Sequence, residues 1–447
     1  MSRAKPRERK ESLRRFKPYP TYKDSRVEWL SEIPAHWEVR KWRYCCRVTE
    51  GQVEPDDDRF RDRILIAPNH IESGTGRILY TETADAQGSI SGKYLVKPGD
   101  IVYSKIRPAL NKVCIASGDW LCSADMYPVA ITDKSLDARY LLYFMLSEPF
   151  VRLMVDESMR VAMPKVNREK LAPCPLLIPG LQDQRRITTF LDRETAKIDA
   201  LVAKKERLIE LLQEQRTALI TRAVTKGLDP KVPMKDSGAE LGEIPAQWDV
   251  LKTTWLFSIG SGTTPRSEDP VYYGGGTPWV TTSELRESVV LSTEKNVTDV
   301  ALREHSSLKV HPKGSVAVAM YGATIGRLGI LGVRATVNQA CCVFSNPQGI
   351  EMPFWFYWLQ MRRPHLISLG YGGGQPNLSQ ELFRSIRVPT PPLSEQRAIA
   401  EFLDRKTEKI DALIAKVQEA IERLKEFRTA LISAAVTGKI DVREEAT

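Results

Sequence analysis

Cationic and amide side chains recur in the short loops of this sequence, and the loops occupy corresponding places in its two halves. The segment GDIVYSKIRPALNKVCI (99–115) matches GSVAVAMYGATIGRLGI (314–330) in pattern, with Lys112 opposite Arg327. Arg and Lys contact guanine edges or phosphates, and Asn and Gln pair with adenine edges. One such loop alone is more often plain surface, but a shared set favours a common nucleic-acid face. The candidate DNA contacts are Lys105, Arg107, Lys112 and Arg168 in the first half and Arg266, Tyr321, Arg327, Gln375 and Asn377 in the second.

Motifs for catalysis are absent from the sequence. The segment GSISGKY (88–94) is one residue too short for a phosphate-binding loop and has Tyr94 where a Ser or Thr is needed. The five histidines have no metal-ligand spacing. We find neither an amino-methyltransferase motif nor a nuclease set of carboxylates and lysine. We therefore expect no catalytic residues, no metal and no cofactor on this chain.

The loops belong to a tandem repeat. Residues 181–225 and 393–437 share 28 identities in 45 ungapped positions, 212 residues apart. The segment KDSRVEWLSEIPAHWEV, from Lys23, returns as KDSGAELGEIPAQWDV, from Lys235. Repeats of this length indicate internal pseudo-symmetry. Near-identical helical segments alternate with diverged segments, so something constrains the helices jointly while the rest varies.

The repeated segments predict two long helices that pair with each other. Apolar residues alternate at spacings of three and four, which is the pattern of a coiled-coil seam. Lys205 and Gln215 interrupt the seam of the first helix, and polar seam residues cost stability but specify register. An intermolecular coiled coil is the alternative to pairing within the chain. The predicted seam residues are Ile198, Leu201, Leu208, Leu212 and Leu219 in the first helix and Ile410, Leu413, Val417, Leu424, Phe427 and Leu431 in the second.

The segments before each helix predict compact globules of mixed α/β structure, with short strands separated by Gly- and Pro-rich turns. The fold class is therefore α+β: two α/β globules alternate with two long helices that pair as an antiparallel coiled coil, in a pseudo-two-fold tandem repeat. Two such helices would hold the globules at opposite ends and at a set distance.

Composition gives weaker information. Residues 1–26 hold ten Lys/Arg and three Asp/Glu, a charge of +7, which leaves only about +2 of the total of +9 for the rest. A basic tail attracts nucleic acid without specificity, although it could equally be solubilising. The sequence has no apolar run long enough for a membrane span. The seven cysteines are typical of buried thiols in a reducing cytoplasm, where we expect the protein.

Three sequence features together resemble the specificity subunit of type I restriction–modification systems: the EIPAHW and EIPAQW motifs, the loop GTTPRSEDPVYYGGGTPWVT (262–281), and the twin helices beginning LSEQRAIAEFLDRKTEKIDALI or similar. The resemblance covers roughly residues 22–440. It implies a non-catalytic, DNA-binding subunit that recognises a bipartite double-stranded DNA site. Its partners would be two modification (methyltransferase) subunits, which bind S-adenosylmethionine and methylate adenine, and ATP-using restriction (motor–nuclease) subunits. The first globule lacks the GTTP…GGG loop, so its DNA face is less well defined.

The resemblance divides the chain into six parts. They are a basic flexible tail (1–26), target-recognition domain 1 (27–180), a central helix (181–227), target-recognition domain 2 (228–392), a C-terminal helix (393–438) and a tail (439–447). A stand-alone nuclease or methyltransferase is a competing interpretation, which the missing motifs oppose. A scaffold without DNA specificity is another, and binding to random and genomic duplexes with equal strength would favour it.

Overall fold

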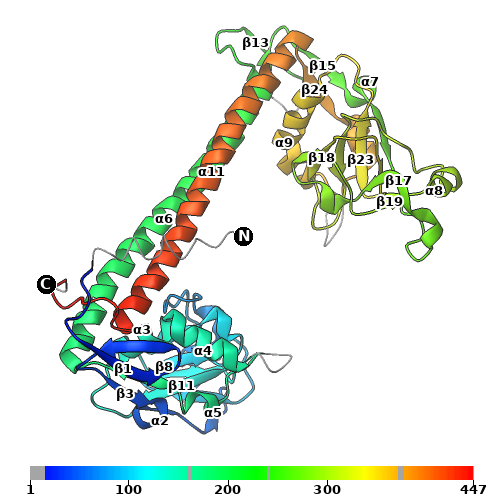
Figure 1. Cartoon of the computed structure of the whole chain (residues 1–447). Coiled ribbons are helices and arrows are strands. Elements are labelled where there is room, and N and C mark those ends of the chain that lie inside the picture. The colour runs from blue at the N-terminus through cyan, green and yellow to red at the C-terminus, as the bar shows by residue number, and fades with distance from the viewer. Residues whose placement is uncertain (1–15, 159–163, 239–241, 371–376, 446–447) are drawn as a thin grey trace. The chain divides into compact units, whose positions relative to one another are not determined.

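A computed structural model describes residues 16–158, 164–238, 242–370 and 377–445. The chain forms two compact units, one of residues 1–207 and 417–447 and the other of residues 208–416. Each unit holds one globule together with parts of both long helices, α6 (Leu181–Lys226) and α11 (Leu393–Val436) (Figure 1). The division therefore cuts through both helices and does not follow the predicted domain boundaries.

The first unit is built from short strands and short helices together with its parts of α6 and α11. Its sheets have the strand orders β1-β2, β5-β7-β10-β6, β4-β11-β8-β9 and β12-β3. The strands are β1 (Tyr22–Val27), β2 (Leu30–Pro34), β3 (Glu38–Lys41), β4 (Cys46–Val48), β5 (Gln52–Val53), β6 (Leu65–Ile66), β7 (Lys93–Val96), β8 (Ile101–Ser104), β9 (Val113–Ile115), β10 (Trp120–Cys122), β11 (Met126–Ile131) and β12 (Pro175–Ile178). The helices besides α6 are α2 (Trp42–Cys45), α3 (Ala138–Leu146), α4 (Glu148–Ser158) and α5 (Arg168–Leu171), with 3₁₀ turns η1 (Pro68–His70) and η2 (Pro108–Leu110).

The second unit repeats this plan with a larger central sheet. Its sheets have the orders β13-β14, β15-β24, β16-β23-β20-β21-β18 and β19-β17-β22. The strands are β13 (Met234–Asp236), β14 (Glu243–Pro245), β15 (Asp249–Lys252), β16 (Ser258–Ser261), β17 (Tyr273–Val280), β18 (Ser288–Val290), β19 (Asn296–Val297), β20 (Val316–Ala319), β21 (Leu328–Leu331), β22 (Thr336–Val337), β23 (Cys341–Ser345) and β24 (Arg387–Thr390). The helices besides α11 are α7 (Thr253–Leu256), α8 (Asp299–Glu304), α9 (Met352–Ser368) and α10 (Gln380–Ser385), with 3₁₀ turns η3 (Pro270–Tyr272) and η4 (Thr282–Glu284).

A buried glutamine attaches each globule to the start of its long helix. The Gln184 side-chain amide donates to the carbonyls of Ser135 (2.7 Å) and Pro179 (2.8 Å) and accepts from the backbone N–H of Asp137. Gln396, the equivalent residue 212 positions later, makes the same three bonds, to Gly349, Pro391 and Glu351. The Gln in the repeated helix start is thus a structural anchor, because it satisfies backbone groups that are buried between globule and helix.

A tyrosine forms a second anchor on each helix. The Tyr143 hydroxyl donates to Asp192 at 2.7 Å and lies 3.4 Å from the Thr195 hydroxyl. In the second unit, Tyr357 contacts Asp404 and Thr407, the residues equivalent to Asp192 and Thr195, at 2.7 and 3.2 Å. Burial, the largest cause, raises the pKa of Tyr357 to about 12. Both hydroxyls therefore stay protonated and act as hydrogen-bond donors.

The EIPAHW and EIPAQW motifs cover the helix ends. Trp37 and Trp248 are fully buried. Trp37 packs against Gly438, just after α11, and Trp248 packs against Gly227, just after α6. Both glycines have φ of +72°, the left-handed conformation that stops a helix.

Within each unit the helix segments run antiparallel, and one arginine–aspartate pair joins them. Arg428 Nε lies 3.0 Å from Asp199 in the first unit, and Arg216 Nε lies 3.1 Å from Asp411 in the second. Residue 411 is equivalent to 199, and 428 to 216, so the two pairs are related by the repeat. Antiparallel pairing of the helices and the pseudo-two-fold repeat are thereby confirmed.

The predicted seam is wrong at alternate positions. Ile198, Leu212, Val417 and Leu431 are buried as predicted, but Leu201, Leu208 and Leu413 are 43%, 40% and 44% exposed. Leu219, Ile410, Leu424 and Phe427 are half-buried. The more buried side of the helices instead contains Val202, Ile209 and Ile414, each one residue after an exposed leucine, and also Ile421. It also contains Arg216 rather than Gln215, while Lys205 stays half-buried as predicted.

The rotation of the helices explains this shift. Heptad spacing allows the residue that follows Ile198 on the seam to be three positions on (Leu201) or four positions on (Val202). Both choices include Ile198, Lys205, Leu212 and Leu219, so the sequence pattern does not distinguish them. The anchors at the helix starts and the arginine–aspartate pairs select the four-residue step. Periodicity therefore identified the helices correctly but not their contact face.

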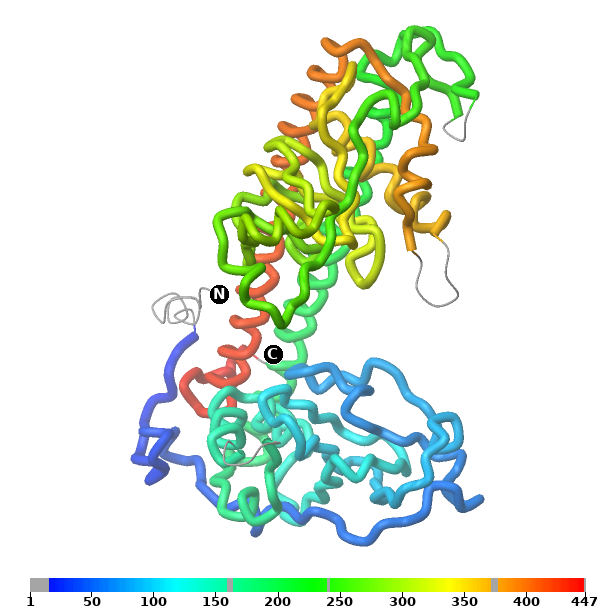
Figure 2. The backbone as a smooth tube through the Cα atoms, turned by 90° about the vertical axis from the view of Figure 1, so that its right-hand side faces the viewer, coloured from blue at the N-terminus to red at the C-terminus, as the bar shows by residue number. Residues whose placement is uncertain are grey.

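The predicted tails are also partly wrong. Phe16 and Tyr19 are buried, and the Phe16 ring meets Phe190 of α6 edge-on at 5.4 Å. At the other end Ile440 and Val442 are buried, and the Asp441 N–H donates to the Lys17 carbonyl at 2.7 Å. Figure 2 shows these blue and red segments beside the first globule. Residues 16–26 and 439–445 thus belong to the packed first unit, whereas residues 1–15 and 446–447 lie outside the described part.

Candidate nucleic-acid interface

The turn between β8 and β9 presents the first group of candidate DNA contacts. Because β8 and β9 are antiparallel neighbours, residues 105–112 form a turn at one end of the sheet. The segment 164–168 lies alongside: the Val166 N–H donates to the Lys105 carbonyl at 2.8 Å, and the Arg107 N–H donates to the Pro164 carbonyl at 3.0 Å. The structure therefore brings Lys105, Arg107 and Arg168 together, although they come from two separate segments.

Tyr127 supports two of these cations. The Lys105 ammonium lies 5.3 Å and the Arg168 guanidinium 5.7 Å from the centre of its ring, and its hydroxyl donates to the Val166 carbonyl. Arg168 also pairs with Glu50. Partial burial, followed by the like charge of Lys165, lowers the pKa of Lys105. An anion placed among these cations would relieve their mutual repulsion. Sequence reasoning missed Tyr127 and Lys165.

Lys112 does not join this group. Its ammonium donates to the Pro68 carbonyl at 2.6 Å. It lines a groove between the loop 71–79 and the helix segments, together with Arg428, whose guanidinium donates to the carbonyls of Gly74 and Thr75 at 3.2 Å. Lys112 was predicted to contact DNA from its position in the turn, but its side chain is occupied by this loop.

The equivalent turn of the second globule, residues 320–327 between β20 and β21, presents Tyr321 and Arg327. The Leu378 N–H donates to the Met320 carbonyl at 2.8 Å, which places exposed Asn377 beside this turn. Arg327 is exposed, whereas Tyr321 is half-buried and packs against the core. Burial raises the pKa of Tyr321. The structure thus brings Tyr321, Arg327 and Asn377 onto one turn and its flank; Gln375 lies outside the described residues.

The two turns share a backbone shape but differ in sequence. Gly322 and Gly326 have φ of +80° and +73°. The equivalent residues of the first globule, Arg107 and Asn111, have φ of +48° and +42°, in the left-handed region that is costly for residues with a side chain. The Asn111 side chain is buried and donates to the Met145 carbonyl at 3.0 Å, which gives it a local role. Arg107 is exposed, so its side chain has no such packing role to offset the strain.

Arg266 is exposed on the loop between β16 and β17, which the core holds through the hydrogen bonds of Trp279 to the Thr263 carbonyl (3.1 Å) and Tyr273 to the Pro265 carbonyl (2.8 Å). Thr264 bonds to Gln339, and the Met320 N–H donates to the carbonyl of the next residue, Ala340. This chain of contacts joins the loop to the turn 320–327. Gln339, a further amide at this edge, was missed because nothing in its local sequence distinguishes it.

Two glycines of the GTTP…GGG loop have a structural role. A Cβ on Gly262 would lie 1.6 Å from the Val337 carbonyl oxygen, and one on Gly275 would lie 2.3 Å from that of Val297. These positions need glycine because two backbone segments of the protein itself meet there. Close approach to DNA is not required to explain them.

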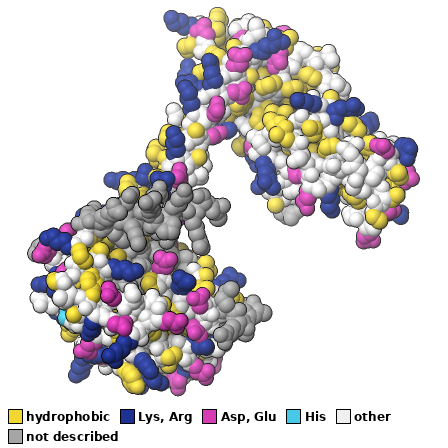
Figure 3. All heavy atoms as spheres, viewed as in Figure 1, with side chains coloured by type: hydrophobic (Ala, Val, Ile, Leu, Met, Phe, Trp, Pro, Cys, Tyr) yellow, Lys and Arg dark blue, Asp and Glu magenta, His cyan; other side chains and the backbone are white. Residues whose placement is uncertain are grey.

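Charge is mixed rather than concentrated over the visible surface. Figure 3 shows Lys and Arg side chains interspersed with Asp and Glu on both globules. A broad basic field is therefore not visible on this face, and discrimination would depend on short-range contacts from the turns.

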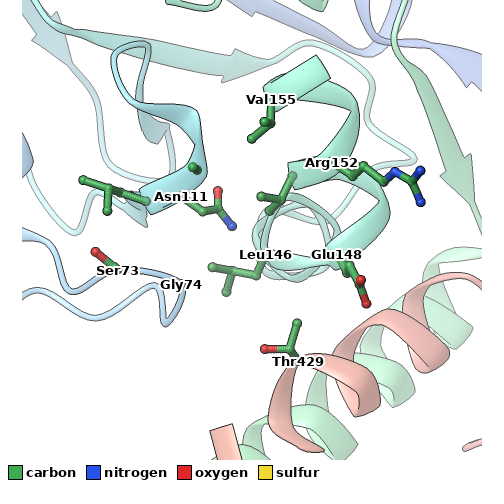
Figure 4. Close-up of a pocket in the computed structure, with 11 residues that line it drawn as sticks. Ser73, Gly74, Asn111, Leu146, Glu148, Arg152, Val155 and Thr429 are labelled. Carbon is green, nitrogen blue, oxygen red and sulfur yellow. The ribbon is translucent and has the colours of Figure 1, made fainter. Parts of the chain in front are cut away.

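The first unit also contains an open cavity of about 710 Å³ between the turn 108–111, α4, the loop 73–74 and Thr429 of α11 (Figure 4). Leu146 and Val155 line it with Asn111 and Glu148. Residues of the predicted DNA-contact set do not line it. In the described part of the chain, no group of three His, Cys, Asp or Glu could hold a metal ion, and no helix is long and apolar enough to cross a membrane.

Comparison with known proteins decides the family. The model of the type I restriction modification DNA specificity domain matches residues 70–211 and 245–423, more than half of the chain. The chain belongs to this family. The two matched ranges correspond to the two halves of the repeat, and the resemblance inferred from the sequence is confirmed.

Individual relatives agree with the family model. A Methanocaldococcus jannaschii protein named as the specificity subunit of type I restriction enzyme MjaX is 26% identical over 431 residues, covering 93% of this chain and 96% of that protein. The EcoDI specificity subunit of Escherichia coli is 29% identical over 234 residues, 52% of this chain and 48% of that protein.

The fold also matches solved structures. A chain from a study of complex assembly and conformational transition of the type I R-M system superposes with a TM-score of 0.69 at 18% identity, covering 91% of this chain and 99% of that chain. The HsdS subunit from Thermoanaerobacter tengcongensis gives a TM-score of 0.51 at 17% identity, covering 91% and 98%. These likenesses support the α+β fold of two globules and two long helices.

Proposed function

We propose that this chain is the sequence-specific DNA-binding subunit of a type I restriction–modification complex. Each globule recognises one half of a bipartite site, and the chain directs adenine methylation and restriction by partner subunits without catalysing either. The observation that carries this proposal is the pair of equivalent turns. They leave the same place in two equally anchored globules but present different side chains, Arg107 and Lys105 in one and Tyr321 and Arg327 in the other.

The strain at Arg107 supports a role in binding. A left-handed residue with a side chain costs roughly 1–2 kcal/mol relative to glycine. Strained residues persist where function benefits from them. Because the Arg107 side chain is exposed, an external partner such as a guanine edge or a phosphate is its natural target.

The helix pair would set the gap between the two half-sites. Each globule is attached to its helix by two anchors, Gln184 with Tyr143 in one unit and Gln396 with Tyr357 in the other. Attachments of this kind leave little freedom where globule and helix meet. A helix of 46 residues, such as α6, is roughly 70 Å long at ~1.5 Å per residue. Its length can then determine how far apart the two recognised sequences lie.

Exposed leucines mark the face of the helices where methyltransferase subunits would dock. Leu201 in the first unit and Leu208, Leu211 and Leu413 in the second are 40–45% exposed. At 100° per residue, Leu201 is on the opposite side of α6 from Asp199 and Ala203, which face the first globule. Leu413 is likewise opposite Asp411, which lines a groove against the second globule. Leu201 and Leu413 are related by the repeat, so one modification subunit in each repeat would meet an equivalent leucine.

S-adenosylmethionine and ATP are expected only on the partner subunits. The purified chain alone should neither methylate nor cleave DNA, and robust activity from a preparation free of partners would overturn that part.

Methylation mapping in cells tests DNA recognition. In a host that supplies the methyltransferase partner, methylated adenines should occur in a two-part sequence that disappears when this gene is deleted. Alanine at Lys105, Arg107 and Arg168 should relax or abolish one half of the sequence, and alanine at Arg266, Tyr321, Arg327 and Asn377 the other. Each lost base contact should cost roughly 1–3 kcal/mol. Lys112→Ala is the matched control in the first globule, because its ammonium is bound to Pro68. Unchanged sites in both multiple variants would contradict the proposal.

A further inference from the structure

Each globule exposes one large aromatic side chain at an equivalent position. Tyr44 is 66% exposed and Trp255 is 68% exposed. Each is the third residue of a one-turn helix, Tyr44 in α2 and Trp255 in α7. α2 follows β3, which pairs with β12, and α7 follows β15, which pairs with β24. β12 and β24 are the last strands before α6 and α11. The neighbouring residues Trp42 and Leu256 are buried, so each short helix has a packed side and an open side. Aromatic side chains this exposed in both repeats are candidates for a binding surface.

Exposed cations lie on or beside the short helix that carries each aromatic residue. In the first globule Lys41, Arg43 and Arg47 are exposed, and the Arg43 guanidinium lies 5.3 Å from the centre of the Tyr44 ring. In the second globule Lys252 pairs across the sheet with Arg387, and both are exposed. No ion pair holds Lys41, Arg43, Arg47, Lys252 or Arg387 among the described residues, in contrast to Arg40, which is paired with Glu38 and Asp133. Each surface thus combines exposed cations with one exposed aromatic ring, and both are called basic patches below.

Short helices connect these patches to the recognition turns. α5 begins at Arg168, beside the turn 105–112, and the carbonyl of Ala172 just after it accepts from the Arg43 N–H at 3.2 Å. α10 follows Asn377, and the carbonyl of Ile386 just after it accepts from the Thr253 N–H at 3.0 Å. Four to six helical residues span about 6–9 Å. That is two to three base pairs of duplex at ~3.4 Å each.

We propose that these two patches, Lys41/Arg43/Tyr44/Arg47 and Lys252/Trp255/Arg387, bind the sugar–phosphate backbone of the duplex beyond the bases contacted by each recognition turn. The inference rests on the proposed function. The unpaired positive charge favours a polyanion over a protein surface, and continuity with the turns places the patches within reach of the same duplex. Arg and Lys contacts to phosphates position a protein on DNA without selecting sequence. Tyr and Trp combine an apolar ring with a polar tip, which suits a sugar next to a phosphate.

Salt dependence of binding provides the test. The complex with the methyltransferase partner is bound to a duplex carrying the mapped site, and its Kd is measured over a series of KCl concentrations. Replacing two phosphate-binding cations should reduce the slope of log K against log [salt] by about 2, since each contributes about 0.9. We expect this for Arg43→Gln/Arg47→Gln and for Lys252→Gln/Arg387→Gln, with the methylated sequence unchanged. Tyr44→Ala and Trp255→Ala should weaken binding several-fold on all duplexes alike.

Matched controls remove equal charge or equal apolar surface elsewhere. Lys309→Gln/Lys313→Gln removes two exposed cations that precede β20, at the opposite end of that strand from the turn 320–327. Ile90→Ala changes a side chain that is 81% exposed. Both controls should keep the wild-type slope and affinity.

Two results would overturn the inference, and a third would refute the proposed function instead. A slope equal to the wild type in both patch variants overturns it. Loss of methyltransferase assembly with an unchanged DNA slope would reassign the patches to protein docking and also overturns it. A wild-type complex that prefers no sequence would instead refute the proposed function itself, which keeps the two failures distinguishable.

Discussion

In the first unit, the turn after β8 places Arg107 in a left-handed conformation; in the second, the equivalent turn after β20 has Gly322. Away from these turns the two units agree closely: Gln184 and Gln396 make the same three bonds, and Tyr143 and Tyr357 contact equivalent partners. The contrast shows which contacts hold globule and helix together and which are free to change. Equivalent anchors support different recognition surfaces because the anchoring residues and their partners lie outside the turns.

A second contrast concerns the seam arginines. The Arg428 side chain is 9% exposed, and it bonds to Asp199 and to the carbonyls of Gly74 and Thr75. The Arg216 side chain is 27% exposed, and it bonds to Asp411. Arg428 of α11 thus fastens the loop 71–79 of the first globule to the helices. The same residue type at equivalent positions therefore has a larger structural role in one unit.

The largest expected effect sharpens this contrast. Arg428→Ala removes three hydrogen bonds of a charged, largely buried guanidinium and should destabilise the first unit by about 3 kcal/mol. Arg216→Ala should cost the second unit only about 1 kcal/mol. Urea unfolding of both variants measures the difference. Equal losses would mean that the bonds to the loop add nothing.

Replacing the glutamine anchors tests the likeness of the two units. Gln184→Leu and Gln396→Leu each remove three hydrogen bonds and leave buried backbone groups unsatisfied, so each should cost about 2–3 kcal/mol. The losses should agree within about 1 kcal/mol when measured by urea unfolding. Glu variants at the same positions set an acceptor-only carboxylate against two carbonyl oxygens, so at neutral pH they should be at least as destabilising as leucine. A large difference between the units would show that the attachments are not equivalent.

The tyrosine anchors should give a smaller effect of equal size. Tyr143→Phe and Tyr357→Phe remove one hydroxyl each without leaving a cavity, and each should cost about 1 kcal/mol. Because the aspartate partners are partly solvated, their lost bond can be replaced by water. Thermal unfolding of the two variants checks the magnitude, and Tyr44→Phe serves as the control because Tyr44 is 66% exposed.

Exchanging the left-handed residues should give the smallest change in stability and separates stability from binding. Arg107→Gly should relieve backbone strain and leave the fold unchanged or up to about 1 kcal/mol more stable, while it weakens DNA binding. Gly322→Ala should destabilise the second unit by about 1 kcal/mol, because its φ is +80° and no atom lies near the added Cβ. Arg107→Gly with unaltered DNA affinity would remove the argument that the strain serves recognition.

The sequence predicted the repeat, the two helices and their antiparallel pairing, because internal identity and apolar periodicity can be read directly from the residues. It did not predict which face of the helices is buried. Leu201 and Val202 both fit the spacing, and tertiary contacts at Gln184 and Asp199 decide between them. The packing of Phe16 and Ile440 was missed because a basic, proline-containing segment is typical of a tail when its apolar residues are sparse.

The candidate DNA contacts were predicted with mixed success. Lys105, Arg107 and Arg168 meet because strands bring their turns together, and a shared pattern between repeats was sufficient to suggest that. Lys112 failed because its partner, the Pro68 carbonyl, is distant in sequence. Tyr127 and Gln339 were missed because each lies in an ordinary strand or turn, and only the fold brings them to the cations or to Thr264.

The central claim is that two globules bind two half-sites whose separation the helix pair sets. It is tested most directly by inserting one heptad into each helix, after Arg207 and after Glu419, positions related by the repeat. Seven residues keep the seam in phase and add about 10.5 Å, or about three base pairs. Insertion into one helix alone is the control, and it should disrupt pairing. Methylation mapping of the double-insertion variant should recover the same half-sites with a gap longer by about three base pairs. A folded variant that methylates the same half-sites at the original gap would contradict the account.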